Sequence, residues 1–131
     1  LAVAYVATAA FGIAMLVITH NLNVVRHITD RMAIMYLGRF VEQGPTQRIF
    51  DAPCHPYTEA LLSANPEPDP DVARDRITLS GEMPSPRNRP TGCEFHTRCH
   101  RARPDCSTRA PGVTRSSDKH AFTCHYPICS S

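Results

Sequence analysis

The sequence predicts an α/β fold, and three stretches carry that prediction. Residues 14–18 form a continuous apolar run that ends in a polar corner at residues 19–21, as a parallel strand covered on both faces would. Apolar residues then recur at helical spacing, at Leu22 and Val25. Residues 32–43 are predicted to form two strands that are joined by a turn at a glycine. Strand, helix and strand in this order predict a right-handed crossover that ends in a β-hairpin.

The segment before the polar corner is expected to hold two elements. Residues 1–10 are rich in alanine and offer no polar face, so they predict a helix that is buried nearly all round. Gly12 separates this helix from the strand at 14–18. We expect that strand to be buried in the sheet.

The elements after the polar corner follow from local signals. Asn21 or Thr19 is expected to cap the first helix. The next strand covers residues 32–37, a turn lies at 38–39, and the chain returns as an antiparallel strand at 40–43.

Two short helices are expected after the hairpin. Thr46 is the predicted cap of a helix at 46–50, and Pro56 suits the first turn of a helix that begins near His55. We expect Tyr57 to be a packing residue. Prolines then stiffen an extended linker, at positions 66, 68 and 70. So few strands cannot close a core, which predicts a piece of a larger fold.

Composition divides the chain into two unlike halves. Aliphatic side chains gather in residues 1–64, whereas residues 65–131 hold most of the prolines and five of the six cysteines. Such a second half lacks a large apolar core and is expected to need metals or disulfides. The net charge is only +2, and the basic residues of the tail have no interleaved aromatic residues. We therefore expect no nucleic acid as a partner.

A membrane-anchored or exported protein is the main alternative. Residues 1–18 carry no charge, and a run of about 18 residues is the lower limit for a membrane span. Against this reading, no basic residue precedes the run and the first one to follow it is Arg26.

One histidine stands where ligands bind in open α/β sheets. His20 follows the apolar strand directly, and the carboxyl end of a strand is the usual ligand-binding edge. An imidazole there either makes a local hydrogen bond at the strand end or contacts a phosphate or an attacking water.

The cysteines form a second candidate site. Cys93, Cys99, Cys106 and Cys124 are separated by five, six and seventeen residues, while Cys54 and Cys129 stand apart. Disulfides, a zinc ion with four thiolates, and an iron-sulfur cluster all remain open, because the spacing matches none of the common patterns. A nearby histidine is a further candidate to replace one ligand: His96, His100, His120 or His125.

Many short pieces in order resemble one protein family. The first half resembles the end of the nucleotide-binding domain of ATP-binding cassette (ABC) transporters, and the second half looks like the C-terminal extension of the ATPase subunits of oligopeptide and dipeptide importers. The matching pieces are Ile18-Thr19-His20-Asn21-Leu22, Met35-Tyr36-Leu37-Gly38-Arg39, Val41-Glu42, Gly44-Pro45-Thr46 and His55-Pro56-Tyr57-Thr58.

The resemblance implies an ATPase that couples ATP hydrolysis, with Mg²⁺, to peptide uptake. His20 would be the switch histidine that contacts the γ-phosphate of ATP. The chain itself contains no G-x-x-x-x-G-K-[ST] phosphate-binding loop and no signature sequence, so this chain alone is not expected to hydrolyse ATP. Residues 1–10 depart from the charged amphipathic helix of the family.

The resemblance also implies partners, a location and a division of the chain. The complete subunit would pair with a second ATPase subunit and with two permease subunits, and indirectly with a peptide-binding protein, as a peripheral protein on the cytoplasmic face of the inner membrane. The C-terminal remnant of the P-loop ATPase domain would cover residues 1–50. A helix and proline-rich linker would cover residues 51–70, and the loop-rich, cysteine-rich extension residues 71–131.

The cysteines match the same family. Gly92-Cys93-Glu94-Phe95-His96-Thr97-Arg98-Cys99, Cys106 and Cys124-His125 look like its C-terminal cysteine motif, which in some members holds a [4Fe-4S] cluster. The resemblance therefore ranks an iron-sulfur cluster first, zinc second and disulfides third for Cys93, Cys99, Cys106 and Cys124. The role of the bound metal centre would be structural. The alternatives are an exported, disulfide-bonded small protein and a stand-alone metal-binding module.

Overall fold

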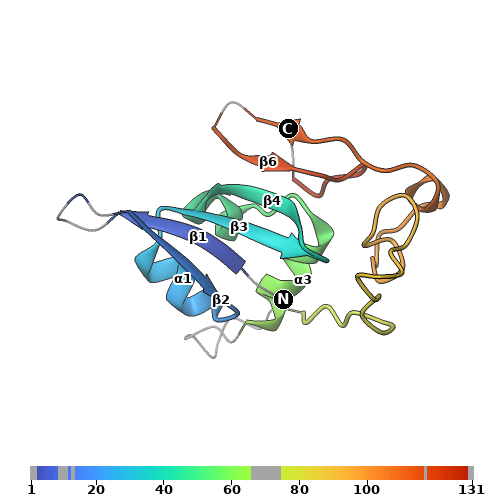
Figure 1. Ribbon diagram of the computed structural model, residues 1–131, viewed down its shortest axis with the longest axis horizontal. Helices are drawn as coiled ribbons and strands as arrows, with labels where there is room; N and C mark the ends of the chain where they lie inside the picture. The colour runs from blue at the N-terminus through green and yellow to red at the C-terminus, as the bar shows by residue number, and fades with distance from the viewer. Residues whose placement is uncertain (1–2, 9–11, 13, 66–74, 117, 130–131) are drawn as a thin grey trace.

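The computed structural model describes residues 3–8, 12, 14–65, 75–116 and 118–129. These residues build one six-stranded sheet in the order β2-β1-β3-β4-β6-β5. Helix α1 (Leu22–Ile28) lies beside β1 on one face and against α2 (Thr46–Asp51), which packs on β3 and β4 (Figure 1). The described part is therefore a small domain of mixed sheet and helices.

The predicted N-terminal helix is wrong. Residues Val3–Thr8 form strand β1, which pairs antiparallel with β2 (Ala14–Thr19). Gly12 lies between the strands with a φ of +74°, a conformation that glycine adopts without steric cost. An apolar segment without a polar face satisfies its backbone groups equally well in a sheet, and here β2 and β3 (Arg31–Tyr36) offer strand edges on both sides.

Strand β2 exists where it was expected, but its predicted burial is wrong. Leu16 is 68% exposed and Ile18 is 66% exposed. Strand β1 takes the position between β2 and β3, which leaves β2 at the edge of the described sheet. Because β2 and β3 each pair antiparallel with β1, they run parallel to each other and are joined through α1.

Local signals at the cap and the hairpin are confirmed. Asn21 caps α1, because its side-chain oxygen accepts hydrogen bonds from the backbone N–H groups of Asn23 and Val24. Strand β3 turns through Leu37 and Gly38, which both have positive φ, into the antiparallel strand β4 (Arg39–Pro45). Positive φ at both turn residues matches the right-handed twist of the two strands.

The predicted cap of α2 is wrong, whereas the predicted start of α3 (Pro56–Ala64) is confirmed. Thr46 is the first helical residue and makes no cap; its hydroxyl lies 2.8 Å from that of Thr29. His55 caps α3, because its Nδ1 accepts the backbone N–H of Tyr57 at 3.0 Å. Pro56 occupies the first turn as predicted.

The core lies between β3, β4, the helices and the C-terminal segment. Its centre is an aromatic group of Tyr36, Tyr57 and Phe95, whose ring centroids lie 5.0 to 5.2 Å apart. All three side chains are at most 1% exposed, which confirms Tyr57 as a packing residue. Phe95 comes from the cysteine-rich part of the chain, so that part contributes a side chain to the core of the domain.

The C-terminal segment also extends the sheet. Strands β5 (Thr114–Arg115) and β6 (Ala121–Phe122) form a short hairpin, and β6 pairs with β4, as seen at the top of Figure 1. The proline linker predicted at positions 66 to 70 lies outside the described residues. No described helix has the length and apolar character needed to cross a membrane.

Candidate functional site

The four predicted ligand cysteines come together in the structure. Cys93, Cys99, Cys106 and Cys124 line one small cavity, which we call the four-thiol site, and all four are free thiols. Cys93 and Cys99 flank a run of turns, Cys106 sits in the 3₁₀ helix Pro104–Ser107, and Cys124 follows β6. The loops that carry these cysteines have no apolar core of their own, and they meet at the cavity that their thiols line.

A glycine permits the close approach of two of these segments. The backbone N–H of Cys93 donates to the carbonyl of Cys106 at 2.7 Å. Gly92 has a φ of +70°, and a Cβ there would lie 2.4 Å from the same carbonyl oxygen. Any other residue at this position would separate Cys93 from Cys106.

Burial favours the protonated form of Cys93, Cys99 and Cys124. It raises the pKa of Cys93 and Cys99, and it raises the pKa of Cys124 to about 11, with the neighbouring thiols adding to each shift. Backbone N–H groups oppose the shifts: that of Arg101 donates to Cys99 Sγ at 3.4 Å. A bound cation is therefore needed to stabilise several thiolates at this site. Backbone N–H groups that donate hydrogen bonds to sulfur are also typical of metal-bound thiolates.

The spacing of the sulfur atoms bears on which metal fits. Among the described residues, one group of His, Cys, Asp or Glu has three ligand atoms all within 4.8 Å of one another, and it is not part of the four-thiol site. A single zinc ion at about 2.3 Å from each sulfur needs them about 3.8 Å apart. The cavity between them has a volume of about 20 Å³. Binding of a single zinc ion would require the sulfur atoms to move closer together. Binding of an iron-sulfur cluster would require a larger cavity.

That closely spaced group was not foreseen from the sequence. It consists of Glu42, Cys54 and His120, and we call it the Glu42 cluster. All three residues are at most 1% exposed. Cys54 is bonded to Cys129 in a disulfide across 75 positions of the chain, with a Cα–Cα distance of 4.6 Å. One signal for this disulfide was present in the sequence: with four of the six cysteines assigned as metal ligands, Cys54 and Cys129 were left as a possible pair.

Hydrogen bonds satisfy the buried carboxylate of Glu42. Its Oε1 accepts the backbone N–H of Cys54 at 2.8 Å and lies 2.7 Å from His120 Nε2. Its Oε2 accepts the backbone N–H of His55 at 3.0 Å. Gly44 leaves room for this arrangement, since a Cβ there would lie 3.0 Å from His120 Cδ2. The cluster thereby joins β4, the start of α3 and β6.

His55 connects the Glu42 cluster with the four-thiol site. It is 1% exposed, and burial lowers its pKa to about 4 despite the nearby Glu42 carboxylate. Neutral His55 is also what the cap requires, because Nδ1 must accept from Tyr57. Its side chain lines both the four-thiol cavity and a second hollow of about 110 Å³.

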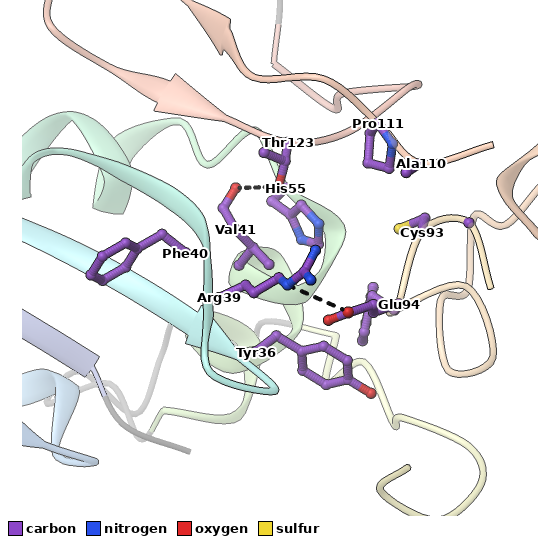
Figure 2. A pocket seen from close by; sticks show the side chains of 12 residues that line it. Tyr36, Arg39, Phe40, Val41, His55, Cys93, Glu94, Ala110, Pro111 and Thr123 are labelled. Carbon is purple, nitrogen blue, oxygen red and sulfur yellow. Dashed lines mark hydrogen bonds and ion pairs between the residues drawn. The ribbon is translucent and has the colours of Figure 1, made fainter. Parts of the chain in front are cut away.

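Figure 2 shows this second hollow, between the β3–β4 hairpin and the loop that carries Cys93. Glu94 from that loop forms ion pairs with Arg39 at 3.6 Å and with Arg89 at 2.9 Å. On the other side, the backbone N–H of Thr123 donates to the carbonyl of Val41 at 2.9 Å. Polar bonds thus close the rim of the hollow and hold the cysteine loop against the hairpin.

Sequence comparison assigns the chain to a family. The pattern described as "Oligopeptide/dipeptide transporter, C-terminal region" matches residues 41–106, about half of the chain. The chain belongs to this family. The match covers most of β4, all of α2 and α3, and three of the four cysteines that line the four-thiol site.

Proteins of this transporter family provide the similar relatives. The chain is 50% identical over 114 residues to a probable peptide ABC transporter ATP-binding protein, y4tS, of Sinorhizobium fredii, across 87% of this chain and 32% of that protein. It is 45% identical to the dipeptide transport ATP-binding protein DppF of Haemophilus influenzae, across 88% and 35%. It is 48% identical to the oligopeptide transport ATP-binding protein OppF of Salmonella typhimurium, across 86% and 34%. The chain spans about a third of the length of these relatives.

His20 of this transporter-family chain lies apart from the cysteines in the fold. It follows β2, between Thr19 and Asn21, and its side chain is exposed. Thr19 Oγ1 accepts the backbone N–H of Asn21 at 3.1 Å, and Asn21 caps α1. The two neighbours of His20 therefore bind backbone groups, while its own imidazole faces solvent.

Proposed function

We propose that the chain is the C-terminal part of an ATP-binding subunit of a peptide ABC importer. The family match and the names of its relatives carry this proposal. The complete subunit would bind ATP with Mg²⁺, pair with a second ATPase subunit and associate with permease subunits on the cytoplasmic face of the inner membrane. A peptide-binding protein would deliver the solute.

The exposed strand β2 supports a larger subunit. Met15, Leu16 and Ile18 present apolar side chains to solvent, and exposed apolar patches mark surfaces that another segment or partner covers. This agrees with the small number of strands, which predicted a piece of a larger fold.

We assign His20 the role of positioning the γ-phosphate and the attacking water. Phosphoryl transfer depends mainly on positioning and charge stabilisation. An exposed imidazole at a strand exit, flanked by two residues that anchor the backbone, can donate to a phosphate oxygen without rearrangement of its own strand.

Kinetics of a complete subunit test this role. His20→Ala should lower the rate of ATP hydrolysis by about 100-fold, as loss of a preorganised donor does, and leave nucleotide binding nearly unchanged. His27→Ala is the matched control, because His27 is also an exposed histidine and lies on the adjacent helix. Equal turnover of the two variants would remove His20 from the mechanism.

We further propose that Cys93, Cys99, Cys106 and Cys124 hold a [4Fe-4S] cluster, with zinc as the second candidate. Support comes from four convergent thiols, from N–H donors aimed at their sulfurs, and from sulfur spacing wider than one ion needs. Ligation would tie together loops that lack an apolar core, so the role is structural.

Anaerobic purification of the chain tests the cluster. We expect visible charge-transfer absorption and about four irons per chain. Cys99→Ser should lose the iron, whereas Cys129→Ser should keep it. A colourless protein with one zinc at the four-thiol site would replace the cluster with zinc, and a metal-free protein would overturn both.

A further inference from the structure

The Glu42 cluster contains a histidine whose second nitrogen faces sulfur. His120 is fully buried, and its Nε2 lies 2.7 Å from Glu42 Oε1. Since a carboxylate only accepts hydrogen bonds, Nε2 carries the proton and donates it. In the neutral ring, Nδ1 is then an acceptor, and it lies 3.8 Å from Cys54 Sγ.

This arrangement does not suit the disulfide form. A disulfide sulfur has no hydrogen to donate, so Nδ1 of a neutral His120 ends in a buried position beside an atom that cannot satisfy it. Reduction of the bond changes the chemistry of the same atoms. The Cys54 thiol then lies beside an imidazole whose free lone pair faces it, and the Cys129 thiol lies next to that of Cys54.

The outer contacts match those of a metal-binding histidine. Metal-bound imidazoles commonly donate their other N–H to a carboxylate, which sets the tautomer and the ring orientation. Glu42 does this for His120, and both of its oxygens are already engaged by N–H groups. Glu42 is therefore a positioning residue, and the ligand atoms on offer are His120 Nδ1 and the sulfurs of Cys54 and Cys129.

We propose that Cys54, Cys129 and His120 form a second metal site, which binds one Zn²⁺ ion when the disulfide is reduced. Two sulfurs and one imidazole nitrogen are a common zinc donor set, with a water in the fourth position. The site is separate from the four-thiol site and uses none of its cysteines.

The change of state balances in two steps. Two molecules of a small thiol donate two electrons and two protons to the Cys54–Cys129 bond and leave as their own disulfide, which yields two protein thiols. Zn²⁺ then replaces the two thiol protons, which go to solvent. The proposed cytoplasmic location would favour the reduced form, because thiols are kept reduced there.

The two cysteines stay together without their covalent bond. The backbone N–H of Ile128 donates to the carbonyl of Cys54 at 3.0 Å. Cys54 is 1% exposed, while Cys129 is only partly buried, so an ion would enter from the side of Cys129. In either state the chain end remains linked to the start of α3.

Alkylation mapped by peptide mass spectrometry tests the site in the full 131-residue chain, because it reports on each cysteine separately. The protein is reduced with a phosphine that does not bind zinc, and iodoacetamide is added with and without Zn²⁺. We expect zinc to slow alkylation of Cys54 and Cys129 at least about tenfold, and His120→Gln to remove that protection.

A matched variant separates this proposal from the cluster. Cys124→Ser should weaken metal protection of Cys93, Cys99 and Cys106 and leave that of Cys129 intact. Equal alkylation of Cys129 with and without zinc in the reduced wild-type protein would overturn the second site. So would zinc protection of Cys129 that survives in His120→Gln. Neither result depends on whether the four-thiol site holds iron.

Discussion

The β2 edge and the centre of the sheet differ in how far their side chains are buried. At the β2 end, Leu16 and Ile18 are about two-thirds exposed. At the β3–β4 side, Ile34 and Tyr36 are at most 1% exposed beneath the helices and the cysteine loop. Backbone pairing is therefore enough to place a strand in the sheet, whereas burial depends on what packs against it. We expect most of the stability to come from the β3–β4 side.

The largest predicted effect is loss of the disulfide on this buried side of the molecule. The Cys54–Cys129 bond closes a loop with a sequence separation of 75. Restricting the unfolded chain over such a loop contributes about 4 kcal/mol in the chain-entropy model. Reduction in the absence of metal should lower the free energy of unfolding by about that amount, measured by urea titration.

Cys129→Ser is the control for this measurement, because its stability should not respond to the reductant. Addition of zinc to the reduced wild-type protein should restore part of the loss, since a bound ion cross-links the same two residues. Equal urea midpoints for the oxidised and reduced wild-type protein would contradict a stabilising cross-link.

A matched pair of isoleucines tests the comparison directly. Ile34 in β3 is 0% exposed and Ile18 in β2 is 66% exposed. Ile34→Ala should cost about 3 kcal/mol, because it removes buried methyl groups and leaves a cavity. Ile18→Ala should cost no more than about 1 kcal/mol. Similar costs for both, measured by urea unfolding, would show that β2 is covered in solution.

The smallest effect concerns pH. His55 has its pKa lowered to about 4 by burial, whereas an unfolded histidine titrates near 6.5. Between these pH values His55 binds a proton in the unfolded state but not in the folded state. The free energy of unfolding should therefore fall as pH decreases from about 6.5 to about 4. At pH 5 the loss relative to pH 8 should be about 2 kcal/mol.

His55→Asn isolates this contribution, because asparagine keeps a cap acceptor for the Tyr57 N–H but does not titrate. The variant should show a shallower loss of stability between pH 8 and pH 5. An unchanged pH profile would mean that His55 is not held neutral by its surroundings.

Sequence reasoning succeeded where the signal was local. The Asn21 cap, the hairpin at Gly38 and the proline-started helix at Pro56 all depend on a few neighbouring residues. It failed at residues 3–8, because an apolar stretch without polar positions has no periodicity that separates helix from strand. The choice there depended on the strand edges offered by β2 and β3.

The site was predictable to the same extent. Cys93, Cys99, Cys106 and Cys124 were named from motif and resemblance, and the structure brings all four to one cavity. The Glu42 cluster was missed, because Glu42 and His120 are 78 positions apart and His120 was considered only as a ligand beside the four cysteines.

The sequence alone determined the Asn21 cap, the hairpin at Gly38, the helix start at Pro56, the position of His20 at a strand exit and the family of the chain. Only the tertiary structure decided that Phe95 completes the core and that Glu42, Cys54, His120 and Cys129 meet. The physical reason is the pairing of β6 with β4. That contact joins distant segments, and its partners are selected by burial and hydrogen bonding in the folded chain, which local sequence patterns do not encode.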